Sequence, residues 1–412
     1  MDRAREKQLT LTLGFMPLVD AAPLIVAKEL GFAEAQGLQL NLVREISWAN
    51  IRDRVIVGHF DAAQMLAPMP IASTLGIGPI ATPMIAPFSL GLGGNAVTMA
   101  NRIVEAMLAD GARLDAGPAE MGRALGKVIA ERRERGEAPY CFAVVHPFSG
   151  HNYDLRYWLA WAGIDLERDV RFLVLPPSLM NDALREGQID GFCAGEPWNS
   201  LAVEAGLGAI VTTKSAIWRQ GPDKVLAARA DFTERRPGAL QALSRALYKA
   251  AEWAGRSENH LELAELLARP EYVGQPSIIL LRALTGRMVV RQGEAAKTIP
   301  DFLVFHDHAA NYPWRSHALW FAAQMARWGQ ITYSPELFAK AENVYRPDLF
   351  RAALADIGVD VPRADSKIEG ALVRPTPVAS RNGTMVLGPD GFFDGRRFDP
   401  DRVAEYLALG AG

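Results

Sequence analysis

Three short runs organise this chain: SGHNYDLRYWL at residues 149–159, DGFCAGEPWN at 190–199 and GPDKVL at 221–226. The first places a polar, titratable turn directly before an aromatic helix, and the second ends an apolar strand in a turn. The third puts a lysine at the head of another apolar strand. In α/β proteins, ligand sites lie where strands stop and loops begin. The three runs therefore predict a cleft that binds a small anion.

The segments that precede these runs alternate between strand and helix patterns. Apolar residues alternate over 9–15 and again over 38–43. Between them they recur at helical spacing, with Asp20 as the expected helix cap. Repetition of this order predicts a parallel sheet with helices on both faces. The pattern restarts at residues 139–147, which indicates a second lobe.

The length of 412 residues exceeds one ordinary core, so two lobes are expected. The predicted fold class is α/β, with a sheet flanked by helices in each lobe. We expect residues 1–100 to start lobe 1, residues 101–215 to form lobe 2, and residues 216–344 to return to lobe 1 and add C-terminal helices. Residues 345–412 are rich in proline, glycine and aspartate, which predicts a wrapping tail.

Charge and hydropathy narrow the class of protein. The formal net charge of −3 argues against the basic surface of a nucleic-acid-binding protein. Residues 1–7 are charged and contain no apolar signal core, and no run approaches the roughly 18 apolar residues of a membrane span. We therefore expect a cytoplasmic protein that contacts neither nucleic acid nor a membrane directly.

Polar and aromatic side chains near the expected strand ends are candidate ligand contacts. Lys224 would supply charge across the cleft, and His151 would donate an N–H beside a positive helix end. Gln64 and Asn95 can donate to an oxygen without adding charge, and Trp48 offers a flat wall. Lys224 has a plainer interpretation as a surface lysine, His151 as a helix cap, and Trp48 and Trp198 as core residues.

The sequence contains few signatures of catalysis or of metal binding. The glycines at 91–94 fail the dinucleotide spacing at Ala96, and no nucleophile elbow is present. His306 and His308 lack a third ligand for a metal. We expect no cofactor, no metal and no catalytic residue, because binding without chemistry fits these features better.

Several motifs together resemble the nitrate/bicarbonate substrate-binding family, over roughly residues 8–330. They are GFMPL (14–18), SWA (47–49), LAPMP (66–70), HN (151–152), LRYWLA (155–160), GEPWN (195–199) and DKVL (223–226). The resemblance implies a two-lobed, periplasmic-binding-protein-like (type II) fold that closes over an oxyanion.

The same resemblance carries site residues across position by position. Trp48, His151 and Lys224 match positions that line the anion pocket. A bordering motif matches Gly195, Glu196 and Trp198. In the family, lysine at position 224 goes with nitrate or nitrite, whereas an acidic residue there goes with bicarbonate. Asn95 stands where the importer proteins tend to carry glutamine, a longer amide.

Since no export signal precedes the first strand, the chain resembles cytoplasmic nitrate/nitrite sensors of the NasS type more than importer subunits. That resemblance implies control of a NasT-type (ANTAR) RNA-binding antiterminator that regulates nitrate assimilation genes. The alternative is the solute-binding component of a nitrate/nitrite ABC importer. A weaker alternative is an enzyme on the same scaffold, of the thiamine-precursor synthesis type.

Overall fold

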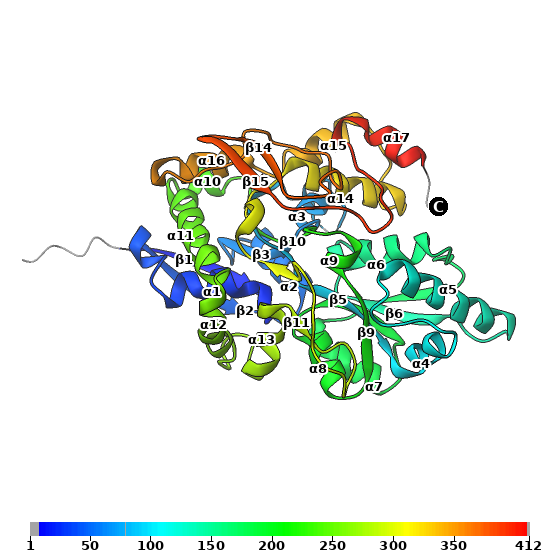
Figure 1. The fold of residues 1–412 in the computed structure, drawn as a ribbon. Coiled ribbons are helices and arrows are strands. Elements are labelled where there is room, and N and C mark those ends of the chain that lie inside the picture. The colour runs from blue at the N-terminus through cyan, green and yellow to red at the C-terminus, as the bar shows by residue number, and fades with distance from the viewer. Residues whose placement is uncertain (1–7, 79, 410–412) are drawn as a thin grey trace, which may run out of the picture.

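A computed structural model describes residues 8–78 and 80–409, so the charged start at 1–7 lies outside the described residues. Two sheets form the centres of two lobes (Figure 1). The first sheet has the strand order β13-β4-β10-β3-β1-β2. Its strands are β1 (Leu9–Phe15), β2 (Leu38–Arg44), β3 (Ala62–Leu66), β4 (Met84–Gly93), β10 (Pro222–Arg229) and β13 (Leu303–Val304).

The second sheet has the order β7-β6-β8-β5-β9. Its strands are β5 (Asn95–Ala100), β6 (Tyr140–Val144), β7 (Val170–Val174), β8 (Gly191–Gly195) and β9 (Gly208–Thr213). In both sheets, parallel pairs such as β1 with β2 and β6 with β7 stand beside antiparallel pairs formed by β5 and β10. The α/β fold with a sheet in each lobe is confirmed, but neither sheet is purely parallel.

Helices flank these sheets. In the first lobe and its return they are α1 (Ala22–Glu29), α2 (Trp48–Ile56), α3 (Met69–Thr74), α10 (Phe232–Arg235), α11 (Ala239–Ala254), α12 (His260–Leu267) and α13 (Ser277–Thr285). In the second lobe they are α4 (Asn101–Ala109), α5 (Pro118–Glu134), α6 (Gly150–Trp161), α7 (Met180–Arg185), α8 (Trp198–Glu204) and α9 (Lys214–Ile217). Among the described residues no helix has the length and apolar character needed to cross a bilayer.

The chain first passes from one sheet to the other between β4 and β5. Gly93 takes a left-handed φ of 73° there, and a Cβ on it would lie 2.3 Å from the carbonyl oxygen of Phe302. Only glycine allows this close backbone approach. Because β5 already belongs to the second sheet, the crossing lies before the expected boundary at residue 100.

The C-terminal segment lies along both lobes, at the top of Figure 1. Its elements are α14 (Arg315–Arg327), α15 (Pro335–Glu342), α16 (Pro347–Leu354), the hairpin β14 (Thr376–Ser380) with β15 (Gly383–Leu387), and α17 (Val403–Ala408). A small hairpin of β11 (Arg287–Met288) and β12 (Lys297–Thr298) precedes it. Phe392 stacks on Trp218 with ring centroids 4.8 Å apart, and Tyr157 Oη donates to Asp394 Oδ2 at 2.8 Å. The tail is therefore packed against the second lobe as well as against α14.

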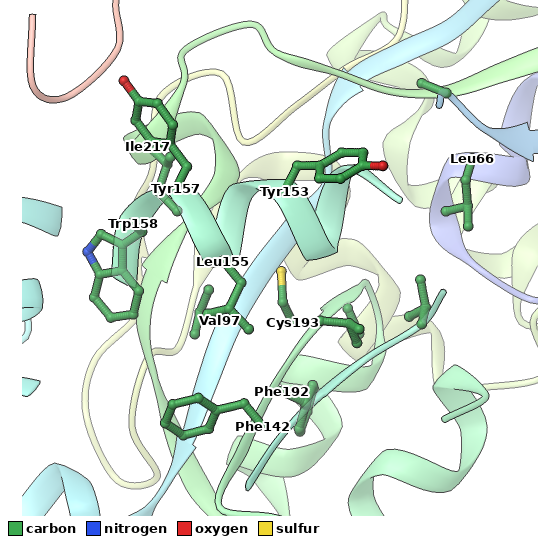
Figure 2. Close-up of a cluster of buried hydrophobic side chains, with 14 of the residues drawn as sticks. Leu66, Val97, Phe142, Tyr153, Leu155, Tyr157, Trp158, Phe192, Cys193 and Ile217 are labelled. Atoms are coloured by element: carbon green, nitrogen blue, oxygen red, sulfur yellow. The ribbon is translucent and has the colours of Figure 1, made fainter. Parts of the chain in front are cut away.

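The aromatic helix of the first quoted run is held by the second lobe's core. Figure 2 shows Leu155 and Trp158 of α6 facing Val97, Phe142 and Cys193 of the sheet below. All five side chains are buried. Burial of side chains of this size contributes roughly 1.5–3 kcal/mol each, so the start of α6 is fixed by packing along its length.

Candidate functional site

Lys224, at the head of β10, is buried where the two lobes meet and is only 1% exposed. Its ammonium group lies 3.0 Å from Asp20 Oδ2, also contacts Asp223 Oδ2, and is 5.5 Å from the centre of the Trp48 ring. Burial lowers the pKa of Lys224, but the two carboxylates outweigh it and raise the pKa above its usual range. The Lys224 ammonium is therefore a permanent cation, and two carboxylates already lie beside it.

Asp20 does not act as the helix cap that its position predicted. It lies in the short 3-10 helix Val19–Ala21, which has no side-chain cap. Its Oδ1 accepts from Gln64 Nε2 at 2.5 Å, and its Oδ2 faces Lys224. The expectation failed because the carboxylate pairs with a buried ammonium group and not with the backbone N–H groups of the helix.

The second lobe contributes the first turn of α6. Ser149 caps this helix by accepting from Asn152 N at 3.0 Å, so His151 is not the cap. The His151 ring is fully buried, and its Nε2 lies 3.7 Å from Asp223 Oδ2. Burial lowers the pKa of His151 to about 3, so the imidazole is neutral and offers one N–H donor.

A second buried ion pair adjoins the first. Lys214, at the start of α9, donates to Asp154 Oδ2 at 2.6 Å. A Cβ on Gly150 would lie 2.9 Å from Asp223 Oδ1 and 3.6 Å from Lys214 Nζ, so the two pairs meet at this glycine. Burial raises the pKa of Asp154 to about 6 against the opposing effect of Lys214.

Strand pairing brings Asn95 and Gly195 to the same place. The two residues are partners in the antiparallel β5–β8 pair. Asp20 Oδ2 lies 3.4 Å from the position that a Gly195 Cβ would take, so a larger residue there would press on that carboxylate. Gln64 is fixed by a hydrogen bond from Met16 N to its Oε1 at 2.9 Å. Lys224 and five of the other seven predicted residues are thus linked in one group. The five are Trp48, Gln64, Asn95, His151 and Gly195.

The other two predicted residues face elsewhere. Glu196 Oε2 accepts from Ser200 N in α8 at 3.2 Å, and burial raises the pKa of this carboxyl group to about 7. Trp198 opens α8 and belongs to a hydrophobic core cluster, and its Nε1 is buried without a partner among the described residues. The backbone of the motif still borders the site, because Glu196 O accepts from Val19 N at 3.0 Å.

Buried polar atoms without a partner gather in this group. Among the described residues, no hydrogen bond reaches Trp48 Nε1, either side-chain atom of Asn95, or either ring nitrogen of His151. Buried polar groups nearly always find partners, and an unpaired one costs about 1–3 kcal/mol. The three side chains come from both lobes: the Trp48 ring lies 5.5 Å from the Lys224 ammonium, His151 lies beside Asp223, and Asn95 pairs with Gly195. Together they can donate N–H hydrogen bonds from several directions to the oxygens of a planar anion.

Besides Asp20, sequence reasoning missed three residues of this group: Asp154, Lys214 and Asp223. Asp154 and Asp223 stand within two of the quoted runs, beside residues that were chosen. Lys214 carries no signal of its own, because its strand β9 was not predicted. No cluster of three His, Cys, Asp or Glu suited to a metal occurs in the part of the chain that the structure describes.

Comparison with known proteins gives a family match over most of this region. Residues 4–268 match the model of the NMT1-like family. The nitrate/nitrite binding protein NrtA of Synechococcus elongatus is 32% identical over 407 residues, covering 96% of this chain and 85% of the relative. The nitrate import ATP-binding protein NrtC of Synechocystis sp. is 37% identical over 354 residues, or 85% of this chain. The match spans only 51% of NrtC, about half its length.

The solved structures give the same result. The crystal structure of the periplasmic nitrate-binding protein NrtA from Synechocystis superposes with a TM-score of 0.84 at 28% identity. The match covers 98% of each chain, so it includes the C-terminal segment as well as both lobes. It confirms the two-lobed, periplasmic-binding-protein-like fold that the motifs implied.

Proposed function

Since the chain belongs to the NMT1-like family, and within it to the NrtA-like substrate-binding proteins, we propose that it binds nitrate or nitrite between its lobes. The relatives that match over most of their own length, the NrtA proteins, are named as binding proteins, so the weaker enzymatic alternative is set aside. The single observation that carries the proposal is the group of unpartnered donors around the Lys224 ammonium.

Each residue has a distinct role in the proposed complex. Lys224 supplies positive charge in a region of low dielectric, where a charge interaction is several-fold stronger than in water. His151 and Asn95 donate hydrogen bonds to the anion from the second lobe, and Trp48 donates from the first. Because the donors belong to both lobes, the bound anion would favour the closed arrangement by population shift.

For the biological role, we propose that the chain serves as the solute-binding component of a nitrate/nitrite importer. Similarity to proteins named for nitrate import and nitrate binding supports this role. The cytoplasmic sensor role with a NasT-type antiterminator partner stays a prediction. An anion-sensitive complex with such an antiterminator, isolated from cells that express both proteins, would favour the sensor over the importer.

Isothermal titration with sodium nitrate, nitrite and bicarbonate tests anion binding. We expect saturable binding of nitrate or nitrite with a Kd of about 1 mM or tighter, which corresponds to about −4 kcal/mol or better. Bicarbonate should bind far more weakly. Absence of both heat and thermal stabilisation at about 100 times that concentration would overturn the proposal, because a ligand of the folded state must stabilise it.

A further inference from the structure

The charges around Lys224 do not favour a bare anion. Three carboxylates, on Asp20, Asp154 and Asp223, lie with two ammonium groups, on Lys214 and Lys224, in one buried group. His151 is neutral, as shown above. The group therefore already carries one net negative charge. A monovalent anion would add a second one where little water screens it, which is unfavourable.

We propose that nitrate enters this site together with one proton, taken from solvent by Asp20 Oδ2. The proposal rests on the proposed function and adds a mode of regulation to it. One anion and one proton arrive together, so the net charge of the buried group is unchanged. The proton converts Asp20 from an acceptor into an O–H donor beside the ligand.

Asp20 is the carboxylate whose contacts suit this role. Its Oδ1 accepts from Gln64 Nε2, and its Oδ2, 3.0 Å from Lys224 Nζ, shares that ammonium group with Asp223, which accepts a hydrogen bond from it. A Cβ on Gly195 would lie 3.4 Å from Asp20 Oδ2, so the glycine leaves room beside that oxygen. Burial raises the pKa of Asp20, with Lys224 opposing and Asp223 adding to the shift.

Each of the other two carboxylates accepts a hydrogen bond from an ammonium group. Asp223 lies between Lys224 and the His151 ring, and these neighbours together with Lys214 lower its pKa although burial alone would raise it. Asp154 is held by its hydrogen bond from Lys214. Once Asp20 is protonated, Lys224 and Asp223 remain as one neutral pair, and Lys214 and Asp154 as another.

The test is nitrate titration of the full chain, between pH 6 and 9, in buffers with different ionisation enthalpies. We expect close to one proton taken up per nitrate at the alkaline end, with affinity falling about tenfold per pH unit there. Asp20→Asn mimics the protonated carboxyl group. It should bind nitrate without proton uptake, with affinity independent of pH and at least equal to that of the unaltered protein at pH 9.

The matched control is Asp61→Asn. The Asp61 carboxylate accepts a hydrogen bond from Thr12 N at 2.9 Å and is not part of the Lys224 group. This variant should keep the proton uptake of the unaltered protein.

Nitrate binding with no proton uptake by the unaltered protein would overturn the proposal, as would proton uptake that persists in Asp20→Asn. Binding that requires an added metal cation, and is lost with a chelator, would overturn it too. If Asp20→Asn fails to fold, proton uptake by the unaltered protein decides alone. No nitrate binding by any folded form at any pH would instead refute the proposed function.

Discussion

At the scale of single residues, the site depends on one buried ammonium group compensated by two carboxylates. Lys224 cannot be removed without leaving Asp20 and Asp223 buried and unpaired. We predict that Lys224→Met lowers the free energy of unfolding by about 3–5 kcal/mol, as is typical when one partner of a buried pair is lost. Urea denaturation monitored by circular dichroism measures the change.

Lys249→Met is the control for that substitution. Lys249 is half exposed and pairs with Glu252 at 2.9 Å on the surface of α11. A surface pair of this kind contributes under about 1 kcal/mol. Equal losses in the two variants would show that the Lys224 contacts are no stronger than surface ones.

Asn95 combines a stability cost with a binding role. Its two side-chain polar atoms are buried and unpartnered among the described residues, so Asn95→Leu should raise the free energy of unfolding by about 1–3 kcal/mol. The same change should weaken nitrate binding about tenfold or more, because a donor to the anion is lost. Titration and denaturation of the same sample measure both effects.

Asn199→Leu is the matched control, because this equally buried amide is fully used. Asn199 Nδ2 donates to Ala194 O at 2.7 Å, and its Oδ1 accepts from Thr98 Oγ1 at 2.9 Å. That variant should lose stability. Destabilisation of similar size in both variants would contradict the role given to Asn95.

Glu196 makes stability depend on pH in a defined direction. Burial raises the pKa of its carboxyl group from 4.5 to about 7, so the folded state binds more protons than the unfolded state between these values. Its contribution to stability is complete below pH 4.5 and is lost as pH rises through 7. Between pH 4.5 and 8 the unaltered protein should lose about 3 kcal/mol relative to Glu196→Gln. A difference between the two proteins that does not change with pH would contradict this.

Sequence reasoning found residues that carry the site's donors but not the charges that balance them. Lys224, His151 and Trp48 were recognisable because each stands beside a turn within a family motif. Asp20 was assigned to a helix cap because local sequence shows only neighbours in the chain. Its actual partner lies about two hundred residues away in the sequence and contacts it only once β10 and β3 pair.

At the scale of elements, the N-terminal turn of α6 positions His151. Ser149 satisfies Asn152 N and donates to His146 O at 2.7 Å, which fixes how the chain enters the helix. Ser149→Ala should cost about 1 kcal/mol of stability and also weaken nitrate binding, because the His151 ring loses its fixed position. Denaturation and titration measure the two effects.

Ser334→Ala provides the control for a cap alone. Ser334 caps α15 by accepting from Leu337 N at 3.1 Å. Its loss should cost similar stability without changing nitrate affinity. If Ser149→Ala binds nitrate as tightly as Ser334→Ala, the geometry of the α6 turn does not matter for the ligand.

Elements with strong periodicity were predicted well. The strand Leu9–Phe15 has the bounds that its alternation predicted. The strands β5 and β9 were missed, because each is buried at every position and so carries no alternation that local sequence could reveal. The hairpin β14–β15 was hidden in a segment that proline and glycine marked only as a tail.

At the scale of the whole molecule, two lobes and a long C-terminal segment bring distant residues to one place. β10 carries Lys224 in the first sheet, while α6 and β5 bring His151 and Asn95 from the second lobe (Figure 1). The two-lobed fold followed from the family motifs and from the restarted strand pattern. The place where the chain crosses between sheets did not, because it depends on the close approach of Gly93 to the backbone at Phe302.

In the proposed complex, hydrogen-bond donors from both lobes hold an oxyanion between the lobes. A crystal structure of the protein grown with nitrate tests it most directly. We expect a planar three-oxygen ligand within about 2.7–3.2 Å of a His151 ring nitrogen and Asn95 Nδ2, next to Lys224 Nζ. Nitrate bound at any other place, while these atoms remain unpartnered at a saturating concentration, would contradict the account.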